Sequence, residues 1–209
     1  NGELYAQNVK FKQLFKQTHK TTGDGSRQGA AIFDKYLFQC HNANRTMAIY
    51  DMETQQLIEE IHTDTASKTY HCNNAGFGTA RFDKSDFFPL LYVSMENIKE
   101  HKVLVFRIQK GEHFKVSCVQ IITFPNPDEI GVYYPNMVLN NEKGELIQMG
   151  YKQNSYKSNT PNNSIEIVRY KLPSLNEGNV MLKADDILGR FNIPCITATQ
   201  GAFCKKGKI

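Results

Sequence analysis

Several features that would assign a function directly are missing from this sequence. Its 209 residues include no tryptophan and no apolar run of about 18 residues, so we expect no membrane span. The formal net charge is only +4, and the lysines are scattered except at Lys205, Lys206 and Lys208. Because no aromatic stacking platform accompanies that short basic run, we expect no nucleic-acid partner. The start of the sequence shows no basic segment followed by an apolar core, and a mature secreted chain would look the same.

The five cysteines are spread along the chain and form neither a C-x-x-C motif nor a dense framework. We interpret them as small apolar residues in strands, and their disulfide state stays open. Cys40–His41 and His71–Cys72 place residue types that bind zinc or act as nucleophiles side by side. Adjacent residues in a strand point to opposite faces of the sheet, so neither pair can hold one ion. We therefore expect no metal site and no cofactor.

What the sequence does contain is a pattern of short strands. Phe and Tyr are abundant, with 13 and 10 residues, and favour half-buried pleated surfaces. The stretch 28–51, QGAAIFDKYLFQCHNANRTMAIYD, predicts three short strands separated by turns at Asp34–Lys35 and at residues 41–45. The same pattern begins again at Gln200-Gly201-Ala202. A repeated unit of short meandering strands is typical of a β-propeller.

We predict an all-β fold, namely a β-propeller of four-stranded antiparallel blades. About three and a half blades fit into the sequence, so we expect it to be part of a longer chain with about six blades when complete. An unclosed set of blades would expose an apolar blade face and an unpaired strand edge. The expected bounds are 28–64 for blade one, 71–125 for blade two, 133–193 for blade three and 198–209 for the start of blade four, with residues 8–15 as a candidate closing strand.

Two local details refine the expected blades. In blade one, Asp51 and Thr54 are suited to hydrogen-bond the turn that joins the two outer strands. In blade three, we expect the fourth strand within residues 180–191, interrupted by a short helical turn at residues 185–188.

The inner strand of each blade begins with polar residues, and the openings of the inner strands are expected to converge on the central channel. Polar groups that meet in a concavity are what a ligand site requires. The alternative is that these side chains hydrogen-bond neighbouring blades and water, as buried polar groups must. The candidate residues of this channel mouth are Gln28, His71, Asn73, Tyr134, Asn136 and Gln200.

The Gln-Gly-Ala opening, followed by YLFQ and IYDMETQQLI, resembles secreted bacterial six-bladed propellers of the NHL, YVTN and TolB-like type. That resemblance covers essentially the whole chain and implies a secreted, periplasmic or cell-surface protein of a bacterium. Thr199-Gln200-Gly201 and Tyr50-Asp51 are also similar to motifs of the five-bladed glutaminyl cyclases. Gln39-Cys40-His41 stands where that family has an acidic residue.

Two functions follow as expectations. The first is a binding or scaffold module that recognises a peptide, a glycan or a partner protein at the channel mouth. The second is an enzyme of the lyase or glutaminyl cyclase type that acts at the same mouth. A bound divalent metal, or an acid with a raised pKa beside His71, would favour the enzyme. A wide apolar or aromatic patch on the loops would favour the binding module. The ligand and the oligomeric state stay open.

Overall fold

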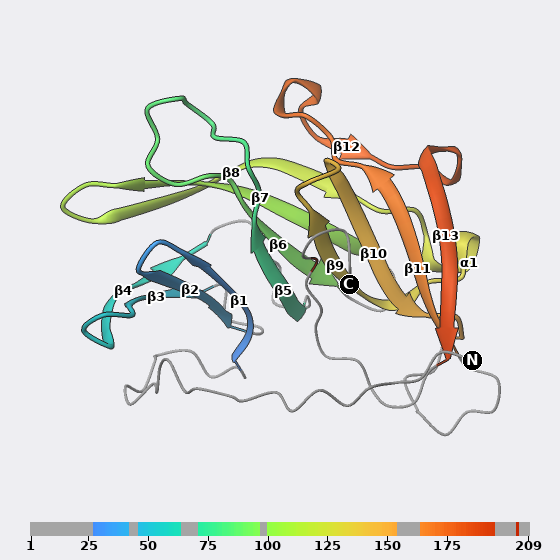
Figure 1. Cartoon of the computed structure of the whole chain (residues 1–209), viewed down its shortest axis with the longest axis horizontal. Coiled ribbons are helices and arrows are strands. Elements are labelled where there is room, and N and C mark those ends of the chain that lie inside the picture. Colours follow the sequence, from blue (N-terminus) through green and yellow to red (C-terminus); the bar gives the residue numbers. More distant parts are fainter. Residues whose placement is uncertain are drawn as a thin grey trace.

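The computed structural model of the chain describes residues 27–41, 46–63, 71–96, 100–153 and 164–194, together with residue 204. Strands dominate these residues and form three sheets, which stand side by side in Figure 1. The helical elements among them are short: α1 (Pro127–Ile130) and the 3-10 turns η1 (Leu175–Glu177) and η2 (Ala184–Asp186). The described residues contain no helix that is long and apolar enough to cross a membrane.

The first sheet is an antiparallel meander in which each strand pairs with the next along the chain. Its strands are β1 (Arg27–Phe33), β2 (Tyr36–His41), β3 (Thr46–Asp51) and β4 (Gln56–His62). The turn between β3 and β4 is fixed by Asp51, whose Oδ1 accepts hydrogen bonds from the backbone N–H groups of Glu53 (2.9 Å) and Thr54 (3.1 Å). Asp51 therefore has the predicted role, whereas Thr54 contributes its backbone to that turn.

The second sheet repeats the meander with longer outer strands. Its strands are β5 (His71–Phe77), β6 (Leu91–Glu96), β7 (His101–Lys110) and β8 (Phe114–Thr123). A fifth, two-residue strand, β12 (Val180–Met181), joins β8 in parallel from much later in the chain.

The third sheet has the order β13-β11-β10-β9. Its strands are β9 (Tyr133–Asn140), β10 (Glu145–Tyr151), β11 (Ser164–Lys171) and β13 (Ile187–Pro194). The prediction of its fourth strand within residues 180–191 is therefore wrong in part, because residues 180–181 belong to the second sheet. The Gln120 amide explains this: its Nε2 donates to the carbonyls of Ser174 (2.8 Å) and Gly178 (2.7 Å) and draws the segment onto β8.

The three sheets repeat one structural unit, because their β-bulges occur at equivalent positions. Each inner strand has one extra residue near its start, at Gln28–Gly29 in β1, at Asn73 in β5 and at Tyr134–Pro135 in β9. Each outer strand has one as well, at Ile58 in β4, Val119 in β8 and Leu188 in β13. Repeated four-stranded meanders with the same irregularities are the blades of a β-propeller, of which the described residues form a part.

The inner strands β1, β5 and β9 lie next to one another, as the blades of a propeller require (Figure 1). A Cβ atom at Gly29 of β1 would lie only 2.6 Å from the backbone carbon of Asn74 in β5, so the two backbones touch there. The Nδ2 of Asn74 donates in turn to the carbonyl of Met137 in β9, at 2.7 Å. Backbone and side-chain contacts thus join the three inner strands in sequence order.

The core between the first and second sheets is aromatic. Phe38 and Phe88 are fully buried at its centre, with ring centroids 5.3 Å apart in an edge-to-face arrangement. Further rings surround them, from Phe33, Tyr36, Phe77, Phe87 and Phe114. Each such pair adds about 0.5–1.5 kcal/mol to the stabilisation from burial alone. This packing holds blade one against blade two.

A buried polar network joins the second and third sheets. His101 is completely buried; its Nε2 lies 2.8 Å from Ser94 Oγ and its Nδ1 lies 3.1 Å from Gln148 Nε2. The Gln148 Oε1 accepts from the Tyr170 hydroxyl (3.4 Å), so the Gln148 amide N–H is left to face His101. Nδ1 is then an acceptor and Nε2 carries the proton, which makes His101 neutral. Burial lowers the pKa of His101 to about 3.

The face of the third sheet that is turned away from the second sheet is also apolar. It presents a cluster of buried side chains that includes Val138, Ile147 and Ile167, and Cys204 packs against this cluster. Cys204 belongs to the predicted start of blade four, which otherwise lies outside the described residues, as does the candidate closing strand at residues 8–15.

Candidate ligand site at the openings of the inner strands

The bulged openings of β1, β5 and β9 bring three of the six predicted mouth residues to equivalent positions. Gln28, Asn73 and Tyr134 each lie at the bulge of their own inner strand. A β-bulge interrupts the ladder and re-aims the side chain of its extra residue. The inner strands adjoin one another, so the structure places these three bulges on neighbouring strands.

Gln28 and Asn73 are both half-buried. Gln28 precedes Gly29, the residue that touches the β5 backbone. A side chain at position 29 would separate β1 from β5, because the would-be Cβ also lies 2.8 Å from the backbone N of Ala75. The glycine of the Gln-Gly-Ala opening is thus required for the close approach of two blades.

Tyr134 has a left-handed backbone conformation, with φ at +49°. This conformation is strained for a bulky residue, and strained residues cluster at active sites, ligand clamps and switch regions. The opposite strand accommodates the bulge through Gly150, where a Cβ atom would lie 2.6 Å from the carbonyl oxygen of Tyr133. The hydroxyl of Tyr133 donates to Asp128 Oδ1 (3.0 Å), an interaction that raises its pKa.

Asn136 follows the bulge in β9 and is buried, with 5% of its surface exposed. Its Oδ1 accepts no hydrogen bond from any group that the structure describes. An unsatisfied buried acceptor costs about 1–3 kcal/mol. Asn136 pairs with Met149 of the outer apolar cluster and lies two residues from Val138, so its side chain is on the face turned away from the second sheet.

The remaining two predicted mouth residues have no described side chain. His71 begins β5, two residues before the bulge, and only its backbone is described. Gln200 lies outside the described residues. The structure therefore places four of the six side chains, on three neighbouring strands, and the full ring stays a prediction.

The Cys–His pairs behave as the strand geometry predicts where both side chains are described. Cys40 points into the core between the first two sheets, whereas His41 lies on the opposite face, with its Nδ1 2.9 Å from Thr46 Oγ1. The Glu60 carboxylate is 3.6 Å from the same nitrogen. Within the described ranges, no three His, Cys, Asp or Glu side chains gather in a geometry that suits a metal ion.

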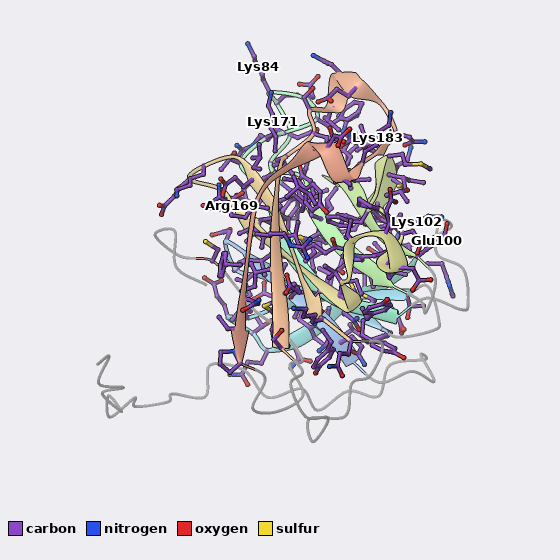
Figure 2. All side chains as sticks on the ribbon, turned by 90° about the vertical axis from the view of Figure 1, so that its right-hand side faces the viewer. Lys84, Glu100, Lys102, Arg169, Lys171 and Lys183 are labelled. Carbon is purple, nitrogen blue, oxygen red and sulfur yellow. The ribbon has the colours of Figure 1, made fainter. Side chains whose placement is uncertain are left out.

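The opposite end of the sheets, called here the hairpin end, contains the loop 78–90 between β5 and β6. Charged side chains lie beside aromatic rings there, and none of them was predicted from the sequence as a site residue. Arg107 makes a bidentate ion pair with Asp86 (2.8 and 2.9 Å) and lies 4.6 Å from the ring centroid of Phe82. The hydrogen bonds from Arg107 lower the pKa of the Asp86 carboxyl. Phe82 and Phe87 are about half exposed there. Figure 2 shows Lys84, Lys171 and Lys183 at this same end.

Comparison with known proteins adds two remote structural likenesses. No family model and no curated protein matches the sequence. Among solved structures, the Kuenenia stuttgartiensis hydrazine synthase is 12% identical, covers 80% of this chain and gives a TM-score of 0.46. The WD40 domain of SCAP from fission yeast is 10% identical, covers 81% and gives 0.33. The chain spans 37% and 40% of the length of these two chains. The fold assignment rests on the repeated sheets themselves.

Proposed function

We propose that this chain is a β-propeller binding module that recognises a neutral, hydrogen-bonding ligand at the openings of its inner strands. One observation carries this proposal: equivalent bulges on three neighbouring inner strands each contain a polar residue, Gln28, Asn73 or Tyr134. Amides both donate and accept hydrogen bonds, and a phenol adds a flat apolar surface. Such a set suits a glycan or an extended peptide segment, including one that belongs to a partner protein.

The ring is proposed to consist of Gln28, Asn73 and Tyr134, completed by His71, Asn136 and Gln200. The strained backbone of Tyr134 supports it. We also propose the blade bounds 28–64, 71–125 and 133–193, and a secreted, periplasmic or cell-surface location in a bacterium. The location is supported by the sequence resemblance alone.

The enzyme reading requires an acid that keeps its proton near neutral pH or a metal-bound water. The carboxyls of Asp51, Asp83 and Asp86 have lowered pKa values, in each case first because of a hydrogen bond from a neighbouring side chain. Ionised carboxylates of this kind do not serve as general acids. The lyase or cyclase function therefore remains the alternative. The binding test would reveal it if a bound glycan or peptide were chemically changed by the protein.

The test is a screen of the purified chain against a glycan array and a displayed peptide library. Asn73→Ala removes one amide of the proposed ring, and Asn176→Ala removes an exposed amide at the hairpin end as the matched control. Loss of a ligand hydrogen bond is expected to weaken the strongest hit about tenfold in Asn73→Ala. Asn176→Ala should bind as the wild type does. Equal binding by all three proteins would contradict the proposed site.

A further inference from the structure

Two thiols from different blades lie near the first bulge. In the register of β1 and β2, Cys40 lies opposite the bulged pair Gln28–Gly29. Cys72 lies in β5, directly before the bulge residue of that strand. Gly29 also touches the backbone of β5, at the residues that follow Cys72 by two and three positions. One glycine therefore adjoins both cysteine-bearing strands.

The two side chains lie in the same buried core. The Cys72 thiol is close enough to the Cys40 thiol and to the backbone N–H of Gly29 for both groups to act on its pKa. Both residues are buried, with 4% and 2% of their surfaces exposed, and both are free thiols. They belong to the core between the first and second sheets. Burial, followed by the nearby Cys40 thiol, raises the pKa of the Cys72 thiol.

We propose that Cys40 and Cys72 are a disulfide-forming pair, which joins blade one covalently to blade two when the chain meets a small-molecule disulfide. Disulfide formation requires two side chains that face each other across a short gap. Both thiols are buried in one core, on strands that adjoin the same glycine, Gly29. Two other cysteines lie elsewhere: Cys118 donates to the carbonyl of Gln120 within β8, and Cys204 packs on the third sheet.

The reaction is a thiol–disulfide exchange in two steps. The Cys40 thiolate attacks one sulfur of oxidised glutathione, forms a mixed disulfide and releases one glutathione thiolate. The Cys72 thiol then loses its proton, its sulfur attacks the Cys40 sulfur, and the second glutathione leaves. The protein loses two electrons and two protons, and one oxidised glutathione becomes two reduced ones. Cys72 is the second nucleophile because burial raises its pKa and disfavours its thiolate.

The bond would fix the part of the molecule that carries two residues of the proposed ring. Gln28 and Asn73 lie next to the joined positions, in blades one and two. The proposal does not depend on the binding function, because it concerns two buried thiols. Because both thiols are buried, the bond is expected to form readily during folding and slowly in the folded chain.

The experiment compares two samples of the full chain in a glutathione redox buffer. One is refolded into the buffer from the reduced, unfolded state, and the other enters it already folded. After alkylation of free thiols, trypsin separates the relevant cysteines: Cys40 falls in peptide 36–45, Cys72 in 69–81 and Cys118 in 116–143, whereas Cys195 and Cys204 share 191–205. Mass spectrometry without reductant is expected to show 36–45 joined to 69–81 in the refolded sample.

Two variants and a stability measurement complete the test. Cys118→Ser should retain the joined peptides, and Cys40→Ser, checked for folding by circular dichroism, should lose them. The oxidised wild type should melt roughly 10 °C above its reduced form, whereas Cys40→Ser should not respond to reductant in this way. The proposal would be overturned if Cys40 and Cys72 were both alkylated in a refolded sample in which Cys118 had been glutathionylated, since the buffer would then have oxidised another thiol but not this pair. Equal amounts of all possible cysteine pairs would overturn it as well.

Discussion

Acidification is expected to weaken the contact between blades two and three through a single side chain, His101. This imidazole is neutral and fully buried, and its pKa in the folded chain is about 3. An unfolded chain presents the same side chain with a pKa of about 6.5. Between these values the unfolded state binds more protons than the folded state, so stability falls as the pH falls from about 6.5 towards 3.

The magnitude follows from the two pKa values. At pH 5 the folded state keeps His101 neutral, whereas most unfolded molecules carry the proton, which costs the folded state about 2 kcal/mol relative to pH 7.5. This figure depends mainly on the ordinary pKa of the unfolded chain, because any folded pKa well below 5 leaves the folded imidazole neutral. The loss grows to about 3 kcal/mol at pH 4.

The assay is urea unfolding of the wild type and His101→Gln at pH 7.5, 6 and 5. Glutamine retains a donor and an acceptor but does not titrate, so the other five histidines contribute similarly to both proteins and cancel in the comparison. The variant is expected to be less stable at pH 7.5 and to lose about 2 kcal/mol less than the wild type on going to pH 5. Identical pH dependence in the two proteins would refute the neutral, buried state of His101.

Two further predictions concern packing between blades one and two. Gly29→Ala should destabilise the chain by about 1–3 kcal/mol, because its Cβ would meet the β5 backbone. The control is Gly111→Ala at an exposed turn, where the new Cβ would lie 3.7 Å from the nearest atom, the carbonyl oxygen of His113. It should cost less than about 1 kcal/mol. Urea unfolding checks both, and equal losses would contradict the close approach of β1 and β5. Phe38→Ala should cost about 3–5 kcal/mol, because it empties the centre of the aromatic core, and Phe82→Ala, half exposed, about 1 kcal/mol or less. A small loss at position 38 would show that this core is loosely packed.

Much of the blade architecture was predictable because it depends on local chemistry. The alternation of apolar and polar residues and the turn residues set the strands of each meander, and Asp51 fixes its turn with hydrogen bonds over two and three residues. The alternation of strand faces likewise separated Cys40 from His41. Gly29 was visible in the sequence, but its contact with the next blade was not.

Features that depend on long-range contacts were not predictable from the sequence. The short strand β12 leaves the third blade because Gln120, more than fifty residues earlier, holds the carbonyls of the preceding loop. Each bulge is one extra residue in a strand relative to its paired strand. The sequence of either strand alone therefore does not predict it. The proximity of Cys40 and Cys72 and the surroundings of His101 likewise need the packed blades.

The central claim, a ligand rim at three equivalent bulges, is tested most directly by an amide NMR titration. The wild-type chain is titrated with the strongest hit from the glycan array or peptide library, and shifts are mapped onto the assigned backbone. We predict the largest shifts at Gln28, Asn73 and Tyr134, with little change in the loop 78–90 at the hairpin end. Shifts confined to that loop, around Phe82 and Phe87, would contradict the claim and place recognition at the opposite end of the blades.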